Sequence, residues 1–293
     1  MRRSVRSLAL VLGLVVASPV CASTGFAFLR LGEGARDAAL GGATVALTSY
    51  TADAANPAAL ANALQAVTLS HTEWIEQIRH EYIGALWSVG SDVISLSARV
   101  SHSEGLERRV GPSLESLGEF GVYEWTAGAA WSHPLSERLR AGIGLRFVRQ
   151  SIFDEAASGA HADAGLLYQT THWDLGAAIR NAGVMNDLDQ AATDLPLQVR
   201  IGGTRRQGDL LLAIAGHWSD ASTDLHTGVE WRTRQSLLLR AGYDSGDTRG
   251  FSYGAGFELA LWRLDYAYLP FGDGLGPAHR FSLRWAIEPA SIH

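Results

Sequence analysis

The sequence predicts an all-β protein, a 14-stranded antiparallel transmembrane β-barrel with an N-terminal hatch segment. Three observations predict this fold. Apolar and polar residues alternate with a period of two from about residue 66 onward, short and long connections alternate along the chain, and residues 23–65 do not alternate. A period of two is typical of strands with one apolar and one polar face. No later segment is an apolar run long enough for a transmembrane helix, so only a closed barrel could place the chain in a membrane.

The first 22 residues predict a secretory signal peptide. Three arginines precede an apolar run at residues 8–16, and Val20, Cys21 and Ala22 offer a small-residue cleavage site. A lipid anchor on Cys21 is the alternative, which the preceding Pro19 disfavours. We expect cleavage after Ala22, which removes the only cysteine and leaves a domain order of signal peptide (1–22), hatch (23–65) and barrel (66–293).

The charge of the mature chain disfavours nucleic acid as a partner. Loss of the three signal-peptide arginines leaves 21 basic residues against 30 acidic ones, a formal charge of −9. No basic block stands out, and a negative chain repels phosphate groups.

The alternation is clear in residues 138–147, where Leu139, Ile143, Leu145 and Phe147 share one face and glycines and arginines occupy the other. We place strands at 66–74, 80–89, 92–101, 119–132, 137–150, 160–169, 172–180, 196–206, 209–218, 225–233, 236–244, 250–259, 261–269 and 279–287. The even number suits a single-chain bacterial outer-membrane barrel.

The connections between these strands predict which rim is external. Links such as 90–91, 170–171 and 207–208 are tight, whereas 102–118 and 181–195 are long and polar. Outer-membrane barrels have short periplasmic turns and long external loops. Aromatic residues fall near strand ends, where interfacial girdles lie: Trp74, Trp87, Trp131, Trp173, Trp218, Trp231, Trp262 and Tyr268. A soluble β-sandwich or propeller is the alternative, although no propeller repeat is visible.

Residues 23–65 are predicted to fold into or across the lumen. Asn56 can cap a short helix, Pro57 suits its first position, and residues 58–64 are good helix formers. The hatch motif consists of Gly34, Arg36, Gly41, Gly42, Asn56 and Pro57. We expect Arg36 to pair with a carboxylate of the lumen and so to anchor the hatch.

The stretches "FAFLRLGEGARDAALGG", "ADAANPAALA" and "VTLSHTEWIEQIRHEYIGAL" resemble the N-terminal signature of the PorV/PorQ family, closer to PorQ. The resemblance covers about residues 26–90. That family is similar in fold to the long-chain fatty-acid transporter barrels. The resemblance implies a hatch-bearing barrel in the outer membrane of a Gram-negative bacterium, with long external loops that bind surface or secreted proteins, as in type IX secretion. The polar C-terminal residues 288–293 depart from the aromatic ending of many such barrels, and the fold alone does not transfer the role.

No motif predicts an enzyme, a cofactor or a metal site. The paired glycines lie outside any strand–turn–helix unit, the histidines lack zinc-protease spacing, and no signature selects a Ser–His–Asp triad. Asp187, Asp189 and Asp194 lack the spacing of a calcium loop, which favours a solvated acidic loop.

Charged residues on the polar strand faces are expected in the lumen, because exposing them to lipid costs a few kcal/mol each. They are Arg146, Glu230, Arg240, Glu258, Arg263, Asp265 and Arg284. An internal ladder of ion pairs that holds the hatch is favoured over a polar conduit.

Two functions remain open. The first is an accessory barrel of protein secretion or surface attachment, and the alternative is a transporter of small hydrophobic molecules such as fatty acids. An apolar cavity lined by Phe26, Phe28, Leu29 and Leu31 would favour transport, whereas a lumen closed by arginine–carboxylate pairs would favour the accessory role.

Overall fold

The computed structural model describes residues 26–32, 34–48, 51–52, 54–60, 65–109, 111, 115–188, 193–233, 236–246, 250–272 and 274–287. Its strands are β1 (Ala66–Glu73), β2 (Arg79–Val89), β3 (Asp92–Glu107), β4 (Glu119–Pro134), β5 (Leu139–Ile152), β6 (Glu155–Gln169), β7 (Trp173–Met185), β8 (Gln198–Gln207), β9 (Leu210–Ser219), β10 (Thr223–Arg232), β11 (Leu237–Asp244), β12 (Gly250–Leu259), β13 (Trp262–Pro270) and β14 (Pro277–Ala286). The predicted signal peptide at 1–22 lies outside the described residues.

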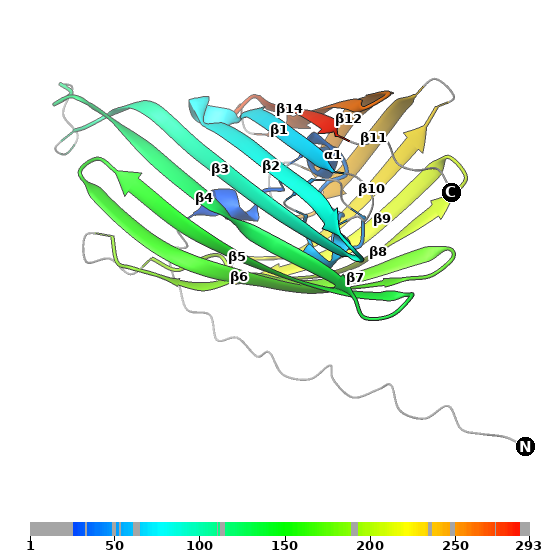
Figure 1. Ribbon diagram of the computed structural model, residues 1–293. Coiled ribbons are helices and arrows are strands. Elements are labelled where there is room, and N and C mark those ends of the chain that lie inside the picture. The colour runs from blue at the N-terminus through cyan, green and yellow to red at the C-terminus, as the bar shows by residue number, and fades with distance from the viewer. Residues whose placement is uncertain are drawn as a thin grey trace, which may run out of the picture.

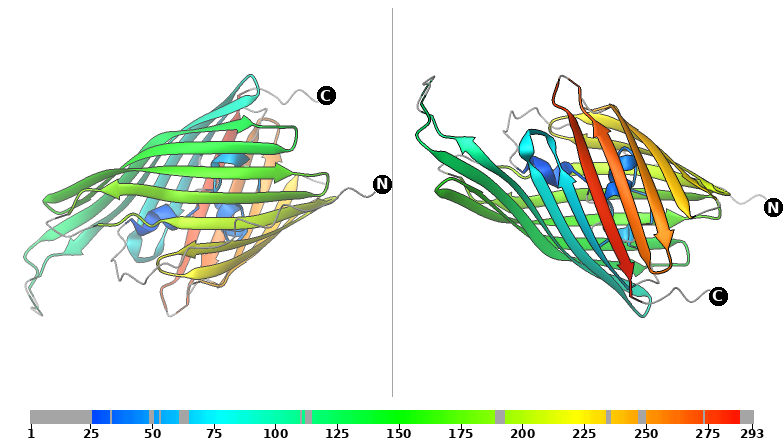
Figure 2. Two further views of the ribbon diagram at one scale, coloured as in Figure 1. Left: turned by 90° about the horizontal axis from the view of Figure 1, so that it is seen from below. Right: turned by 90° about the horizontal axis from the view of Figure 1, so that it is seen from above.

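The strands form one closed antiparallel barrel, which confirms the predicted 14-stranded barrel (Figure 1). Each strand pairs with its neighbours in sequence, and β1 pairs with β14 from Ala66–Ala286 to Glu73–His279 to close the wall. In the view from above, β14 lies directly beside β1 (Figure 2). Closure gives every described strand a hydrogen-bonded neighbour on both sides, as spanning a bilayer requires.

The barrel is apolar outside and polar inside. On β5, Leu145 is 66% exposed on the outer face, whereas the adjacent Arg146 is 6% exposed on the inner face. Exposed leucine, isoleucine and phenylalanine side chains continue around the wall on the other strands. Because hydrocarbon accepts these side chains and water does not, the outer face is a lipid-facing surface.

Aromatic side chains mark the two membrane interfaces. Trp87, Trp131, Trp173, Trp231, Trp262 and Trp285 all lie within three residues of a strand end at the rim with short connections. Tyr123, Tyr243, Tyr253 and Tyr268 lie toward the opposite rim, which has the long connections. Aromatic girdles at both ends of an apolar band are typical of outer-membrane barrels. The rim with short connections is accordingly the periplasmic one.

The described residues of 26–60, here called the internal segment, lie within the lumen. They contain the 3-10 turn η1 (Ala27–Arg30), the short helix α1 (Ala35–Ala39) and the 3-10 turn η2 (Pro57–Ala59). α1 packs against β11–β14, and η2 packs against β4–β6 on the other side of the barrel. The turns and helix are visible between the walls in Figures 1 and 2. Among the described residues, no helix is long and apolar enough to cross a membrane.

Wall glycines let the internal segment approach the sheet closely. A Cβ on Gly142 of β5 would collide with the backbone of Pro57 and Ala58, and one on Gly242 of β11 would collide with Leu40 and Gly41. Gly41 itself has a φ of 63°, a left-handed conformation that glycine adopts without strain. Backbone therefore lies against backbone at both docking points.

The predicted elements differ from the structure in three ways. β3, β6 and β7 extend beyond the predicted 92–101, 160–169 and 172–180, so parts of the expected long loops are strands. The helix predicted after Asn56 is a single 3-10 turn over the described residues, with 61–64 outside them. α1 was not predicted, because one helical turn between glycines gives no measurable periodicity.

Candidate functional site

Six of the seven predicted lumen charges gather beside α1. Arg36 binds Glu230 in a bidentate pair, with Nε 2.8 Å from Oε2 and Nη2 2.7 Å from Oε1. Glu230 also accepts a hydrogen bond from Nε of Arg240 at 2.7 Å. Because Glu230 is only 3% exposed, both guanidinium groups compensate a carboxylate that has left water.

The same network continues along β12 and β13. Nη1 of Arg240 lies 2.8 Å from Oδ1 of Asp265, and Nε of Arg263 donates to Oδ2 of that carboxylate at 2.8 Å. Arg263 also donates to Glu258 at 2.8 Å. Arg284 lines a small cavity of about 40 Å³ that Arg36, Arg263 and Asp265 share. This part of the lumen is filled by alternating charges.

Arg146 belongs to a second cluster on the opposite wall. It donates to the carboxylate of Asp163, which lies 3.6 Å from Nε of Arg180 and accepts from the backbone of Asn181 at 2.8 Å. Asp163 and Arg180 were not among the predicted lumen residues. Their position on the inward face of predicted strands is the signal that could have identified them.

The remaining hatch-motif residues hold the internal segment in shape. Gly34 precedes α1 as its N-cap, and Gly41 and Gly42 turn the chain after it with φ values of 63° and 80°. Asn56, which is fully buried, accepts from Ala58 N at 2.9 Å and donates to the carbonyls of Val45 and Leu166 at 3.0 and 2.9 Å. Asn56 thus joins both parts of the segment to β6, and Pro57 begins η2.

The apolar residues expected around a transport cavity are packed instead. Phe26, Phe28 and Leu29 are each at most 3% exposed and contact Val148 and Leu195. Leu31 lines two interior cavities of about 60 and 10 Å³. A space of this size holds one or two water molecules and not a hydrocarbon.

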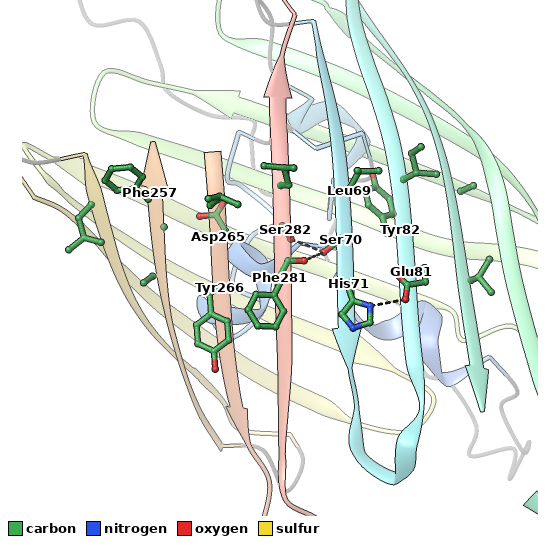
Figure 3. Close-up of a pocket in the computed structure, with 18 residues that line it drawn as sticks. Leu69, Ser70, His71, Glu81, Tyr82, Phe257, Asp265, Tyr266, Phe281 and Ser282 are labelled. Carbon is green, nitrogen blue, oxygen red and sulfur yellow. Dashed lines mark hydrogen bonds and ion pairs between the residues drawn. The ribbon is translucent and has the colours of Figure 1, made fainter. Parts of the chain in front are cut away.

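A large cavity lies on the outer wall. It is an apolar groove of about 800 Å³ across β1–β3 and β11–β14, here called the wall groove (Figure 3). Its outward side chains include Leu69, Ile83, Phe257, Leu264 and Phe281. This volume lies within the range of sites that enclose small organic ligands. No sequence pattern indicated the groove, since it depends on the cross-section of the closed barrel.

Polar groups form the floor and one side of the wall groove. Ser70 of β1 and Ser282 of β14 have their hydroxyl oxygens 2.7 Å apart, and Ser282 accepts from the backbone of Ala35 at 2.8 Å. His71 and Glu81 face outward and form a hydrogen bond of 2.7 Å beside Phe281 (Figure 3). The seam of the barrel therefore links the groove directly to the internal segment.

The described residues contain no group of three or more His, Cys, Asp and Glu side chains arranged to hold a metal ion. The acidic-loop residue Asp189 lies outside the described part of the chain, whereas Asp187 and Asp194 lie within it.

Solved structures with the same fold include three hydrocarbon channels. CymD, a monoaromatic hydrocarbon channel, matches with a TM-score of 0.65 and 11% identity over 89% of this chain and 98% of its own. The toluene transporter TodX of Pseudomonas putida matches with a TM-score of 0.62 and 13% identity, over 87% of this chain and 96% of its own. The toluene transporter TbuX of Ralstonia pickettii matches with a TM-score of 0.59 and 12% identity, over 87% of this chain and 97% of its own. The likeness spans almost the whole length of each of these chains.

No family model matches the sequence, and a search of curated proteins found no match. The PorV/PorQ resemblance therefore gains no support and stays a prediction. The barrel closure, the apolar outer band and these structural matches together establish the coarser conclusion: the chain is an outer-membrane β-barrel with the fold of the hydrocarbon channels CymD, TodX and TbuX.

Proposed function

We propose that this barrel takes small hydrophobic molecules across the outer membrane. The observation that carries the proposal is the wall groove, an apolar space of about 800 Å³ that faces the lipid. Hydrophobic solutes partition into the hydrocarbon of the bilayer. A groove that opens to this phase can receive them without any passage through water.

The position of the groove over the seam supports this proposal. Ser70 and Tyr82 line both the groove and one interior cavity, and Asp265 and Ser282 line both the groove and another. Only the thickness of the sheet separates the groove from the lumen there. The seam is fully paired in this state, so passage requires a change at β1 and β14 or in the internal segment.

The structural neighbours favour the same class of solute. Two of them are toluene transporters and one is a monoaromatic hydrocarbon channel. The arginine–carboxylate pairs that fill the lumen meet the criterion given above for a secretion accessory barrel, but the three solved structures give that role no support. It stays a prediction that capture of a surface or secreted protein from solubilised outer membranes would test. We further propose that the barrel is not an enzyme.

Uptake of labelled toluene and of a labelled fatty acid tests the proposal in a Gram-negative host that lacks its own hydrocarbon-uptake barrel. Expression should raise the uptake rate of at least one. Ala255→Trp fills the wall groove and should abolish most of the gain, whereas Ala177→Trp, on the outer face of β7 away from the groove, should not. Unchanged uptake in cells that contain folded wild-type barrel would reject the transport function.

A further inference from the structure

A second cavity lies inside the barrel near its external rim. Its volume is about 60 Å³, and it is here called the rim cavity. His217 lies two residues before the external end of β9, His226 lies near the start of β10, and Asp244 ends β11. The turn of the internal segment at Gly41 and Gly42 forms the inner side of the cavity. The rim cavity is thus separate from the wall groove.

Two buried histidines dominate its wall. The rings of His217 and His226 have centroids 3.7 Å apart with an interplanar angle of 32°. They are 7% and 6% exposed, and Nε2 of each has no hydrogen-bond partner within the described structure. A buried polar atom without a partner costs about 1–3 kcal/mol, so two such nitrogens in one cavity favour a ligand group that can form hydrogen bonds with them.

The hydrogen bond of His226 fixes what its second nitrogen can do. Nδ1 lies 2.6 Å from the carbonyl oxygen of Gly41, which can only accept, so Nδ1 carries a hydrogen and donates it. In the neutral ring Nε2 is then an acceptor. A ligand group that brings a hydrogen to this atom completes the ring's hydrogen bonds.

The charges around the cavity select the rest of the ligand group. Arg30, Arg200 and Arg280 line it, against the carboxylates of Asp37 and Asp244. Three guanidinium groups against two carboxylates leave an excess of positive charge. Guanidinium groups bind carboxylate oxygens strongly and often in pairs. A protonated carboxyl group carries both a hydrogen for Nε2 and oxygens for guanidinium, and it is the smallest common group that does so.

We propose that the rim cavity binds the carboxyl group of a small organic acid. The carboxylate enters together with one proton from solvent, which it shares with Nε2 of His226, and its oxygens lie in the positive field of the arginines. A space of about 60 Å³ holds the carboxyl group alone, so any hydrocarbon part remains outside it. Either a free short acid or the head group of a larger acid meets this description.

Calorimetric titration of the purified, folded barrel in detergent with benzoate tests the site. We expect saturable binding of one benzoate per chain. Benzyl alcohol, which has the same ring and a hydroxyl in place of the carboxylate, should not bind there. Acetate distinguishes a free short acid from the head group of a larger acid. If acetate competes with benzoate, the site takes free short acids. If acetate does not compete, the site takes the head group of a larger acid.

His226→Asn keeps a side-chain donor for the Gly41 carbonyl and removes the Nε2 position. It should weaken benzoate binding about tenfold or more. His161→Asn is the matched control, because His161 is also buried in the lumen but lies outside the rim cavity. His217→Leu provides a second variant if His226→Asn does not fold.

The proposal is overturned if folded wild-type barrel does not bind benzoate. It is equally overturned if benzyl alcohol binds as tightly, or if the folded His226 or His217 variant binds benzoate as well as wild type does. These outcomes are independent of toluene uptake through the wall groove, so failure of the proposed function is distinguishable from failure of this site.

Discussion

Replacing Arg36 with alanine should release α1 from the wall without unfolding the barrel. Arg36 forms a bidentate pair with Glu230, and their side chains are 14% and 4% exposed. Removing one partner of a buried pair costs about 3–5 kcal/mol, because it leaves the other charge uncompensated. Glu230 keeps its hydrogen bond to Arg240 at 2.7 Å, and Arg36 is partly hydrated. The cost should accordingly be lower, at about 2–3 kcal/mol.

Hydrogen exchange measures this cost locally. The amides of Ala38 and Leu40 donate to Gly34 and Arg36 carbonyls at 3.1 Å and should be protected while α1 is docked. A loss of about 2–3 kcal/mol raises their exchange rate by about 30- to 150-fold when exchange requires undocking of the segment. Amides of the β4–β5 ladder in the same sample should keep their protection.

Arg232→Ala is the control for this experiment. Arg232 also lies on β10 and pairs with Glu258, but its side chain is 42% exposed and it does not join the internal segment to the wall. An exposed pair contributes at most about 1 kcal/mol, so the α1 amides should change by less than about fivefold. Equal exchange in the two variants, or loss of protection throughout the barrel in Arg36→Ala, would refute the anchoring role of the pair.

Three further predictions concern packing and closure. Gly142→Ala should displace η2 and expose it to protease, because the added methyl group collides with the backbone of Ala58. Gly144→Ala is the control on the same inner face. Its added methyl group meets its nearest atom at 3.5 Å, so the cleavage rate should stay unchanged. Asn56→Ala should free the same region at a cost of about 3 kcal/mol, since it removes three hydrogen bonds of a buried side chain. An undiminished protease resistance would contradict this. Because β1 pairs with β14 along its whole length, the unheated protein should migrate differently from the boiled protein in detergent gels, and identical migration would contradict a closed barrel in solution.

Strand alternation predicted the lumen charges because lipid excludes charge from the other face. The alternation assigned Arg146, Glu230 and Arg240 to the inside without any knowledge of their partners. Their pairing depends on register: Glu230 lies opposite Arg240 across β10 and β11, whereas Arg36 reaches Glu230 from 194 positions earlier in the chain. Local sequence contains no signal for such distances.

Other features escaped prediction for equally physical reasons. Glu104 and Glu107 were predicted to lie in a loop, because the alternation of apolar and polar residues ends before them. β3 nevertheless continues through both residues, beyond the apolar band, where water solvates both faces of a strand and no alternation is needed. The wall groove combines residues from seven strands at opposite ends of the barrel sequence. The rim cavity forms where His217 and His226 meet the turn at Gly41. His226 is 185 positions from Gly41 in the sequence, so local patterns could not indicate this contact.

The position of the internal segment has a consequence for the stiffness of the wall. α1 contacts the last strands of the sheet and η2 contacts β4–β6, so the segment connects two regions that are distant along the sheet. The hydrogen bond from Ala35 to Ser282 attaches it to the seam itself. The N-terminal residues therefore brace opposite walls of the barrel from within, and the seam cannot shift without a change in the packing of α1.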